Sequence, residues 1–202
     1  MRTKQYALTE KLALEGEEQN SDFRGLVRQW KECRFKIYEL CGEIEKLRIV
    51  ARELAIQGDF TYYLKLKNSY EAKDWKQIYP DIHQTLFLHC RYYGNTYTSA
   101  LIEEREFGTL LTYVQEEPRR VLEFYRPLLP LYQEQVYELF NQLITTSAGN
   151  ANNRSHYQNV CSHLRLLVKI GGKKIAGELV GQLLQQYPRK PAFRQELQSV
   201  KI

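Results

Sequence analysis

The chain has 202 residues, of which 43% are hydrophobic and 26% are charged, and its formal net charge is +5. This composition is ordinary for a soluble folded protein, and the length allows one sizeable core or a short row of repeats. A membrane-spanning helix is excluded, because no apolar run approaches the roughly 18 residues needed to cross a bilayer.

The N-terminal and cysteine patterns predict a cytoplasmic protein. Residues 1–19 carry too many charges for the apolar segment of a signal peptide. Four cysteines in a chain of this length, without a secretory signal, are typical of reduced thiols rather than of a disulfide framework.

Apolar residues recur at helical spacing throughout the N-terminal half of the chain. The expected helices cover residues 1–19, 23–40, 44–58, 60–70 and 75–90. We expect the first helix to end near Gly16 and to turn these side chains inward: Tyr6, Leu8, Leu12, Ala13 and Leu14. The second is basic on one side, and its apolar side carries Phe23, Leu26, Val27, Trp30, Cys33, Ile37, Leu40 and Cys41. In the fifth helix, Pro80 predicts a kink or a new helix start.

Residues 44–63 combine one amphipathic helix, a tight turn and the start of a second helix. The first helix has an apolar stripe roughly 100° wide, typical of a core-facing helix. This stripe consists of Ile44, Leu47, Ala51, Leu54, Ala55 and Gly58. Gly58 permits the left-handed conformation that ends helices, and Asp59 can cap the helix that follows. The pattern predicts a helix hairpin.

Further helix pairs are expected in the C-terminal half, and no segment shows a convincing strand pattern. The expected helices cover residues 97–104, 107–114, 121–125, 136–144, 157–168 and 175–184. Residues 145–153 predict the one polar, turn-rich loop, after which Asn153 or Ser155 caps the next helix. Gly171 and Gly172 predict a turn, and Pro191 can begin a last short helix.

These hairpins predict an all-α fold. They recur at roughly 40-residue spacing, with turns near Gly16, Gly58, Glu106 and Gly171. The expected architecture is an α-helical repeat, a tetratricopeptide-like helix-hairpin solenoid. Its organisation is either a single α-solenoid domain over 1–202, or N-terminal helix hairpins over 1–144 and a basic terminal hairpin over 153–202.

A series of short motifs carries a family resemblance. In chain order they are LEGE at 14–17, DF and LVRQW within 22–30, DFTYYLKLK at 59–67, NRSHY at 153–157, HL at 163–164, GG at 171–172 and YPRKPA at 187–192. Together they resemble the helical C-terminal region of bacterial SWIM zinc-finger proteins, over nearly the whole chain. In that family a zinc module, thought to bind DNA or protein, lies N-terminal to this region. The resemblance therefore implies a helical region that stands alone or is a truncated copy.

The zinc signature of that family, Cys-x-Cys followed by Cys-x-His, is not met. The chain has no Cys-x-Cys pair, although residues 161–163 spell Cys-Ser-His. Residues i and i+2 of a helix point about 200° apart, so Cys161 and His163 cannot readily share one tetrahedral ion. We expect no bound metal and no cofactor.

No catalytic set can be assembled from the sequence. His156 and His163 are two helical turns apart, about 10 Å along the axis, which is too far for joint ligation, so surface histidines are expected. The run from Gly171 to Lys174 follows a helix rather than a strand and lacks the spacing of a P-loop. Adjacent tyrosines at 62–63 and 92–93 offer stacking platforms for bases, but packing between helices is the favoured interpretation. We therefore expect no enzymatic activity.

The positive charge is concentrated near the C-terminus. Residues 151–202 carry nine Lys or Arg and two Asp or Glu, a net charge of +7. The candidate contact residues for a partner or for nucleic acid are Arg154, Arg165, Lys169, Lys173, Lys174, Arg189, Lys190 and Arg194. A solvated face of a terminal helix pair is the commoner origin of such charge.

The favoured hypothesis is a non-enzymatic protein-interaction scaffold with an unidentified protein partner and no membrane contact. The alternative is a nucleic-acid-binding helical repeat that uses the basic C-terminal segment. The sequence leaves the oligomeric state open.

Overall fold

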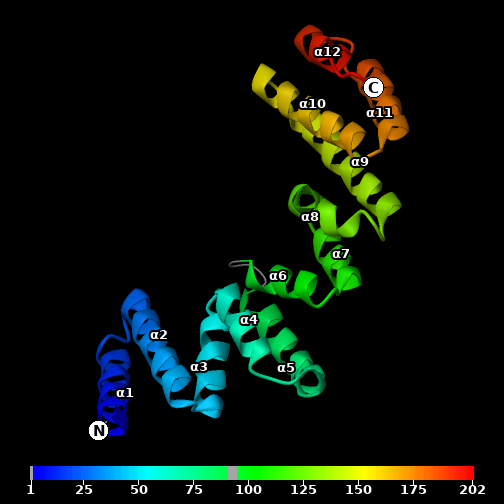
Figure 1. The fold of residues 1–202 in the computed structure, drawn as a ribbon. Helices are drawn as coiled ribbons and strands as arrows, with labels where there is room; N and C mark the ends of the chain where they lie inside the picture. The colour runs from blue at the N-terminus through cyan, green and yellow to red at the C-terminus, as the bar shows by residue number, and fades with distance from the viewer. Residues whose placement is uncertain (1, 91–94) are drawn as a thin grey trace. The chain divides into compact units, whose positions relative to one another are not determined.

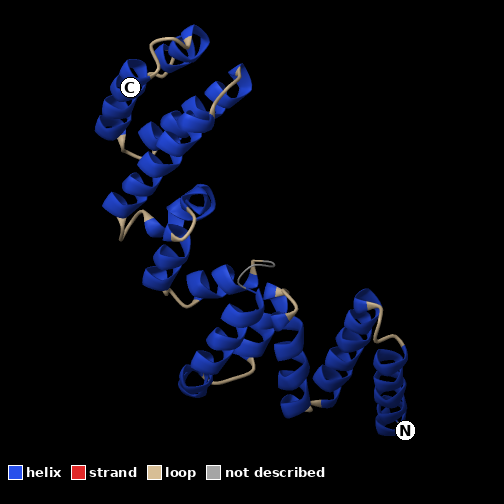
Figure 2. Cartoon of the chain, turned by 180° about the vertical axis from the view of Figure 1, so that it is seen from behind, coloured by secondary structure: helices blue, strands red, loops and turns tan. Residues whose placement is uncertain are grey.

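The structure, a computed structural model, describes residues 2–90 and 95–202 (Figure 1). Within these ranges it contains twelve α-helices, one short 3-10 helix and no β-strand (Figure 2). The predicted all-α class is therefore confirmed. The tyrosine pair at 92–93 lies outside the described residues.

The chain divides into two compact units, Met1–Arg105 (unit 1) and Glu106–Ile202 (unit 2). The helices of unit 1 are α1 (Arg2–Gln19), α2 (Arg24–Cys41), α3 (Ile44–Ile56), α4 (Phe60–Asn68), α5 (Ala72–Cys90) and α6 (Thr96–Glu103). Those of unit 2 are α7 (Phe107–Gln115), η1 (Pro118–Arg120), α8 (Val121–Leu128), α9 (Gln133–Asn150), α10 (Arg154–Lys169), α11 (Lys173–Gln186) and α12 (Pro191–Gln198). The domain organisation proposed from the sequence stays a prediction.

The predicted hairpin at residues 44–63 is confirmed as α3 and the start of α4. The buried side of α3 is formed by Leu47, Val50, Ala51, Leu54 and Ala55. Gly58 has a positive φ of 100°, a conformation that would be strained in a residue with a side chain. The Asp59 carboxylate caps α4 by accepting a hydrogen bond from the backbone N–H of Thr61 at 2.9 Å.

The prediction for the inner side of α1 was partly wrong, since only Ala13 of the expected apolar residues is fully buried. The helix continues past Gly16 to Gln19, and its leucines are exposed by 59%, 52% and 44%: Leu8, Leu12 and Leu14, respectively. The side that faces α2 is narrow, with Ala13 fully buried and Gly16 against the ring of Trp30. A Cβ at position 16 would overlap that ring, so the close approach of the two helices requires glycine.

Polar contacts, rather than packing of the leucines, determine which side of α1 faces α2. Arg34 of α2 donates from Nη1 to both carboxylate oxygens of Glu17, at 2.9 and 3.1 Å. The Tyr38 hydroxyl donates to Glu10 at 2.9 Å, and Lys46 of α3 donates to the same carboxylate at 3.1 Å. Hydrogen bonds with charged partners are the stronger kind, and they fix which side of α1 faces inward.

The apolar side predicted for α2 was also partly wrong. Phe23, Leu26 and Leu40 are exposed, whereas Phe35, Ile37 and Tyr38 are buried, and only Ile37 of these three was expected. Two of the basic residues on the other side of the helix pair with neighbouring elements instead. Arg28 pairs with Asp59, and Lys31 pairs with Glu53 of α3 at 2.7 Å. Phe35 packs edge-on against Tyr62 of α4, with ring centroids 5.0 Å apart.

Two sequence features do not divide the chain into separate helices as they could have done. Pro80 lies inside α5, which runs without a break from Ala72 to Cys90. The loop predicted at 145–153 is helical as far as Asn150, because α9 continues through it. Ala148 follows Ile144 by four residues and is fully buried with it, so packing overrides the polar, turn-rich composition.

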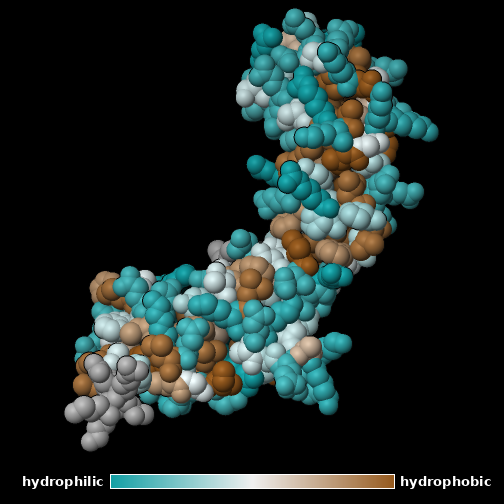
Figure 3. Space-filling view, in the orientation of Figure 1, coloured by the Kyte–Doolittle hydropathy of each residue, from teal (hydrophilic) through white to brown (hydrophobic). Residues whose placement is uncertain are grey.

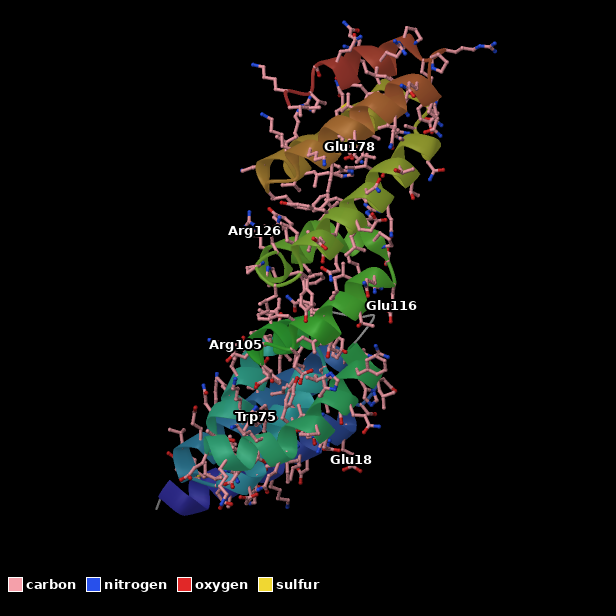
Figure 4. All side chains as sticks on the ribbon, turned by 90° about the vertical axis from the view of Figure 1, so that its right-hand side faces the viewer. Glu18, Trp75, Arg105, Glu116, Arg126 and Glu178 are labelled. Atoms are coloured by element: carbon pink, nitrogen blue, oxygen red, sulfur yellow. The ribbon has the colours of Figure 1, made fainter. Side chains whose placement is uncertain are left out.

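The Glu104 carboxylate, which follows α6, joins three helices of unit 1. Its Oε1 atom accepts hydrogen bonds from the Tyr63 hydroxyl at 2.8 Å and from the Trp75 indole N–H at 3.1 Å. Lys67 of α4 lies 2.9 Å from the same oxygen. Trp75 is buried among the helices of unit 1 (Figure 4). Burial, and secondly the bond to Glu104, raise the pKa of Tyr63, so its hydroxyl remains a proton donor.

Replacing Glu104 by alanine should destabilise unit 1. The change leaves the buried Tyr63 hydroxyl and Trp75 N–H without their acceptor, so we expect a loss of about 2–3 kcal/mol in the free energy of unfolding. Both tryptophans of the chain, Trp30 and Trp75, lie in unit 1, so urea unfolding followed by tryptophan fluorescence reports on that unit.

Glu103→Ala is the matched control, because Glu103 pairs with Lys67 at 2.8 Å but lies at the surface. An exposed ion pair contributes at most about 1 kcal/mol. Equal losses in the two variants would show that Glu104 does not hold the three helices together.

Candidate interaction surface

Two of the eight predicted contact residues tie α10 to the end of the chain. Arg154 lies 3.0 Å from a carboxylate oxygen of Glu196, which also accepts from Gln158 at 3.3 Å. Arg165 donates to the Ser199 hydroxyl at 3.0 Å. These exposed guanidinium groups attach α12 and the residue after it to α10, so they already have polar partners within unit 2.

Two further predicted contact residues are half-buried and satisfy backbone carbonyls. Lys190 donates to the carbonyl of Ala151 at 2.7 Å, and its ammonium lies 4.7 Å from the centre of the Tyr187 ring. Arg194 donates to the carbonyl of Leu184 at 2.6 Å, near the end of α11. Each cation satisfies an acceptor in or near a helix end, which is a structural role.

The other four predicted residues are exposed. Lys169, Lys173 and Lys174 surround the turn between α10 and α11, and we call these three residues the lysine turn. Within the described part of the chain, neither they nor Arg189 form an ion pair or a side-chain hydrogen bond. The Tyr137 hydroxyl donates to the Ile170 carbonyl at 3.0 Å and so anchors this turn to α9.

The exposed cations do not form one patch. Lys190 contacts Ala151, just before α10 begins, so its neighbour Arg189 belongs to that end of the helix. The lysine turn begins at the other end, at Lys169, and a helix of this length spans about 24 Å. The candidate surface therefore reduces to the lysine turn, with Arg189 separate from it.

His163 was predicted to lie at the surface, and this was wrong. It is only 8% exposed, because the side of α10 that packs against neighbouring helices is wider than its apolar stripe. Within the described residues, its Nδ1 atom has no hydrogen-bond partner. Burial, assisted by the positive charge of Arg119, lowers the pKa of His163, so the ring is held in its neutral form.

Cys161 is buried in the apolar stripe, as predicted. Burial raises the pKa of its thiol to about 11, which keeps it protonated at neutral pH and unsuited to bind metal or to act as a nucleophile. Across residues 2–90 and 95–202, no group of three or more His, Cys, Asp or Glu is arranged to hold a metal ion.

Two hollows on the surface differ in character. One in unit 2, about 460 Å³ in volume, is lined mainly by exposed polar side chains of α9 and Gln115. The other, about 330 Å³, lies in unit 1 between α2, α3 and α4, and we call it the aromatic groove. Phe35, Tyr38 and Leu47 are the buried residues that line it. This groove is not apparent from the sequence, because its lining comes from three helices and from a side of α2 that was predicted to face solvent.

No protein-family model matches the chain, and no curated protein or solved structure is significantly similar to it. The resemblance to the helical region of SWIM zinc-finger proteins thus stays a prediction from the motifs. Among the helices that the structure describes, none is both long and apolar enough to cross a membrane.

His163 should make the stability of unit 2 depend on pH. An unfolded histidine has a pKa near 6.5, and the folded pKa is lower, so the unfolded state binds the proton first as the pH falls. Stability is therefore unaffected above about pH 6.5 and decreases below it, by at most about 1.4 kcal/mol per pH unit, until the folded pKa is passed.

The measurement is urea unfolding followed by far-UV circular dichroism from pH 7.5 to pH 5.5. His163→Leu should remove this component of the pH dependence, whereas His156→Gln, at an exposed position, should retain it. Identical pH profiles for wild type and His163→Leu would contradict the prediction.

The adjacent residues Arg189 and Lys190 allow a matched test of which cations are structural. Lys190→Met removes the bond to Ala151 and the contact with the Tyr187 ring, so we expect a loss of about 1–2 kcal/mol in unfolding free energy. Arg189→Met removes an exposed charge and should change stability by less than about 0.5 kcal/mol. Thermal unfolding followed by circular dichroism compares the two, and equal effects would argue against the structural assignment of Lys190.

Proposed function

We propose that this chain is a non-enzymatic protein-interaction scaffold built from helix hairpins in a solenoid-like, tetratricopeptide-like arrangement. The observation that carries the proposal is the packing order within each unit. In unit 1, α1 packs on α2, α2 on α3 and α3 on α4, and in unit 2, α9 packs on α10 and α10 on α11. Packing between sequence neighbours is typical of repeat proteins, which present extended binding surfaces.

The surface supports the same proposal. Apolar side chains reach the surface in patches among polar ones (Figure 3). In unit 1 the large exposed ones include Leu8, Leu12, Leu40, Ile44 and Ile49. Exposed apolar residues gathered in patches are typical of sites that contact other proteins.

Three partly buried carboxylates of unit 1 support a structural role rather than catalysis. Glu104, Glu10 and Glu17 each accept hydrogen bonds that join helices. A scaffold whose helices are joined in this way loses little conformational freedom on binding, which favours affinity. Cys33, Cys41 and Cys161 are free thiols, which suits the cytoplasmic location that we propose.

Nucleic-acid binding is the second candidate function, and the lysine turn favours it. Three exposed ammonium groups around one anchored turn provide a contact for phosphate groups. The resemblance to a region that accompanies a possible DNA-binding module agrees with this alternative.

Salt dependence separates the two functions. A protein partner is first identified by chemical cross-linking to the whole chain, then purified, and its dissociation constant is measured between 50 and 500 mM salt. Apolar contacts should keep this constant within about threefold over that range. Failure to find any saturable partner would count against the scaffold.

For the alternative, the probe is a labelled single-stranded oligonucleotide followed by fluorescence anisotropy. Neutralising the lysine turn with K169Q, K173Q and K174Q should lower the slope of log affinity against log salt by about 2. The control K36Q, K73Q and K76Q removes the same charge from exposed positions of unit 1 and should leave the slope unchanged. No binding at low salt would eliminate this function.

A further inference from the structure

The aromatic groove of unit 1 combines an apolar floor with one charged group on each side. Phe35 and Tyr38 of α2 and Leu47 of α3 are buried and form the floor, and Ile44, which is 43% exposed, lies at the edge. The volume of about 330 Å³ is near the lower limit of roughly 300 Å³ for ligand pockets in proteins. It therefore suits one or two large apolar side chains.

Lys65 forms the α4 side of the groove. Its ammonium lies 4.6 Å from the centre of the Phe35 ring and 4.8 Å from that of Tyr62. Within the part of the chain that the structure describes, no carboxylate pairs with it. Two aromatic rings thus hold a half-buried cation in place, which reduces the entropy that it loses when an anion binds. Asn68, one helical turn further along α4, offers an exposed amide donor on the same side.

Glu39 forms the α2 side of the groove. It is exposed, and no cation among the described residues pairs with it. The two sides therefore carry opposite charges across an apolar floor. A polyanion such as nucleic acid is disfavoured here, because Glu39 would repel its phosphates. A ligand with a carboxylate on one side of an apolar group matches both the charges and the floor.

We infer that the aromatic groove binds a peptide segment of a partner protein in which a large apolar side chain has an aspartate or glutamate beside it. The apolar side chain enters between Phe35 and Leu47, and the carboxylate pairs with Lys65 and accepts from Asn68. A basic residue on the other side of the segment pairs with Glu39. The inference rests on the proposed scaffold function and specifies the chemistry of the partner at one of its surfaces.

The test is selection of random ten-residue peptides, displayed on phage, against the whole immobilised chain. The selected sequences should share a large apolar residue next to an acidic one. A synthetic copy of a selected peptide is then labelled, and its dissociation constant is measured by fluorescence anisotropy. Lys65→Glu should weaken binding by at least about tenfold, whereas Lys73→Glu, at an exposed position of α5 that does not line the groove, should leave it unchanged.

A second variant guards against loss of folding in Lys65→Glu, and circular dichroism verifies the fold of each. Glu39→Lys changes an exposed side chain. It should weaken the binding of peptides that carry a basic residue on the other side of the apolar residue. Selected peptides without the acidic residue, or equal affinity of wild type and both groove variants, would overturn the inference. If the cross-linked partner binds Lys65→Glu as tightly as wild type, the groove inference fails and the scaffold function stands. If no partner is found but the selected peptides respond as described, the groove stands and the scaffold function does not.

Discussion

The arrangement of unit 1 depends on one shared acceptor, the Glu104 carboxylate. Partial burial of a carboxylate costs folding free energy unless the group is well hydrogen-bonded. The buried hydroxyl of Tyr63 and the indole N–H of Trp75 in turn need an acceptor, and Glu104 provides it. Each group thus satisfies the others, and α4, α5 and the end of α6 meet at one point. From Trp75 the aromatic contacts continue along α5 to Tyr79 and then to His83, with ring centroids 6.0 and 5.8 Å apart.

The same network positions the aromatic groove, because both sides of α4 are occupied. Tyr62 and Tyr63 are adjacent in sequence and point to different neighbours: Tyr62 packs against Phe35 of α2, and Tyr63 against Trp75 of α5. In the same way, Lys67 pairs with Glu104, whereas Lys65 lies over the ring of Phe35. Fixing α4 on the Glu104 side therefore fixes where Lys65 lies beside the groove.

Local signals were predicted well from the sequence, and the orientation of helices was not. The Gly58 turn and the Asp59 cap depend on residues within a few positions, so their patterns sufficed, and of the two caps predicted before α10 the structure uses Asn153. The inner sides of α1 and α2 depend on contacts between helices, such as Arg34 with Glu17, which apolar spacing does not report. Likewise, burial of Ala148 extends α9 through a polar segment whose composition predicts a loop.

The candidate site shows the same limit in terms of charge. A net charge of +7 over residues 151–202 counts every cation equally, yet Lys190 and Arg194 satisfy carbonyls of unit 2 itself. A charged side chain is available to a partner only when the fold itself supplies no acceptor for it. Amino-acid composition does not report whether such an acceptor exists. By this criterion the lysine turn in unit 2 and Lys65 in unit 1 are the more informative cations. Lys65 is informative for a further reason: it lies beside an apolar floor, and no carboxylate among the described residues pairs with it. A cation that the fold positions but leaves unpaired specifies the charge of what binds there.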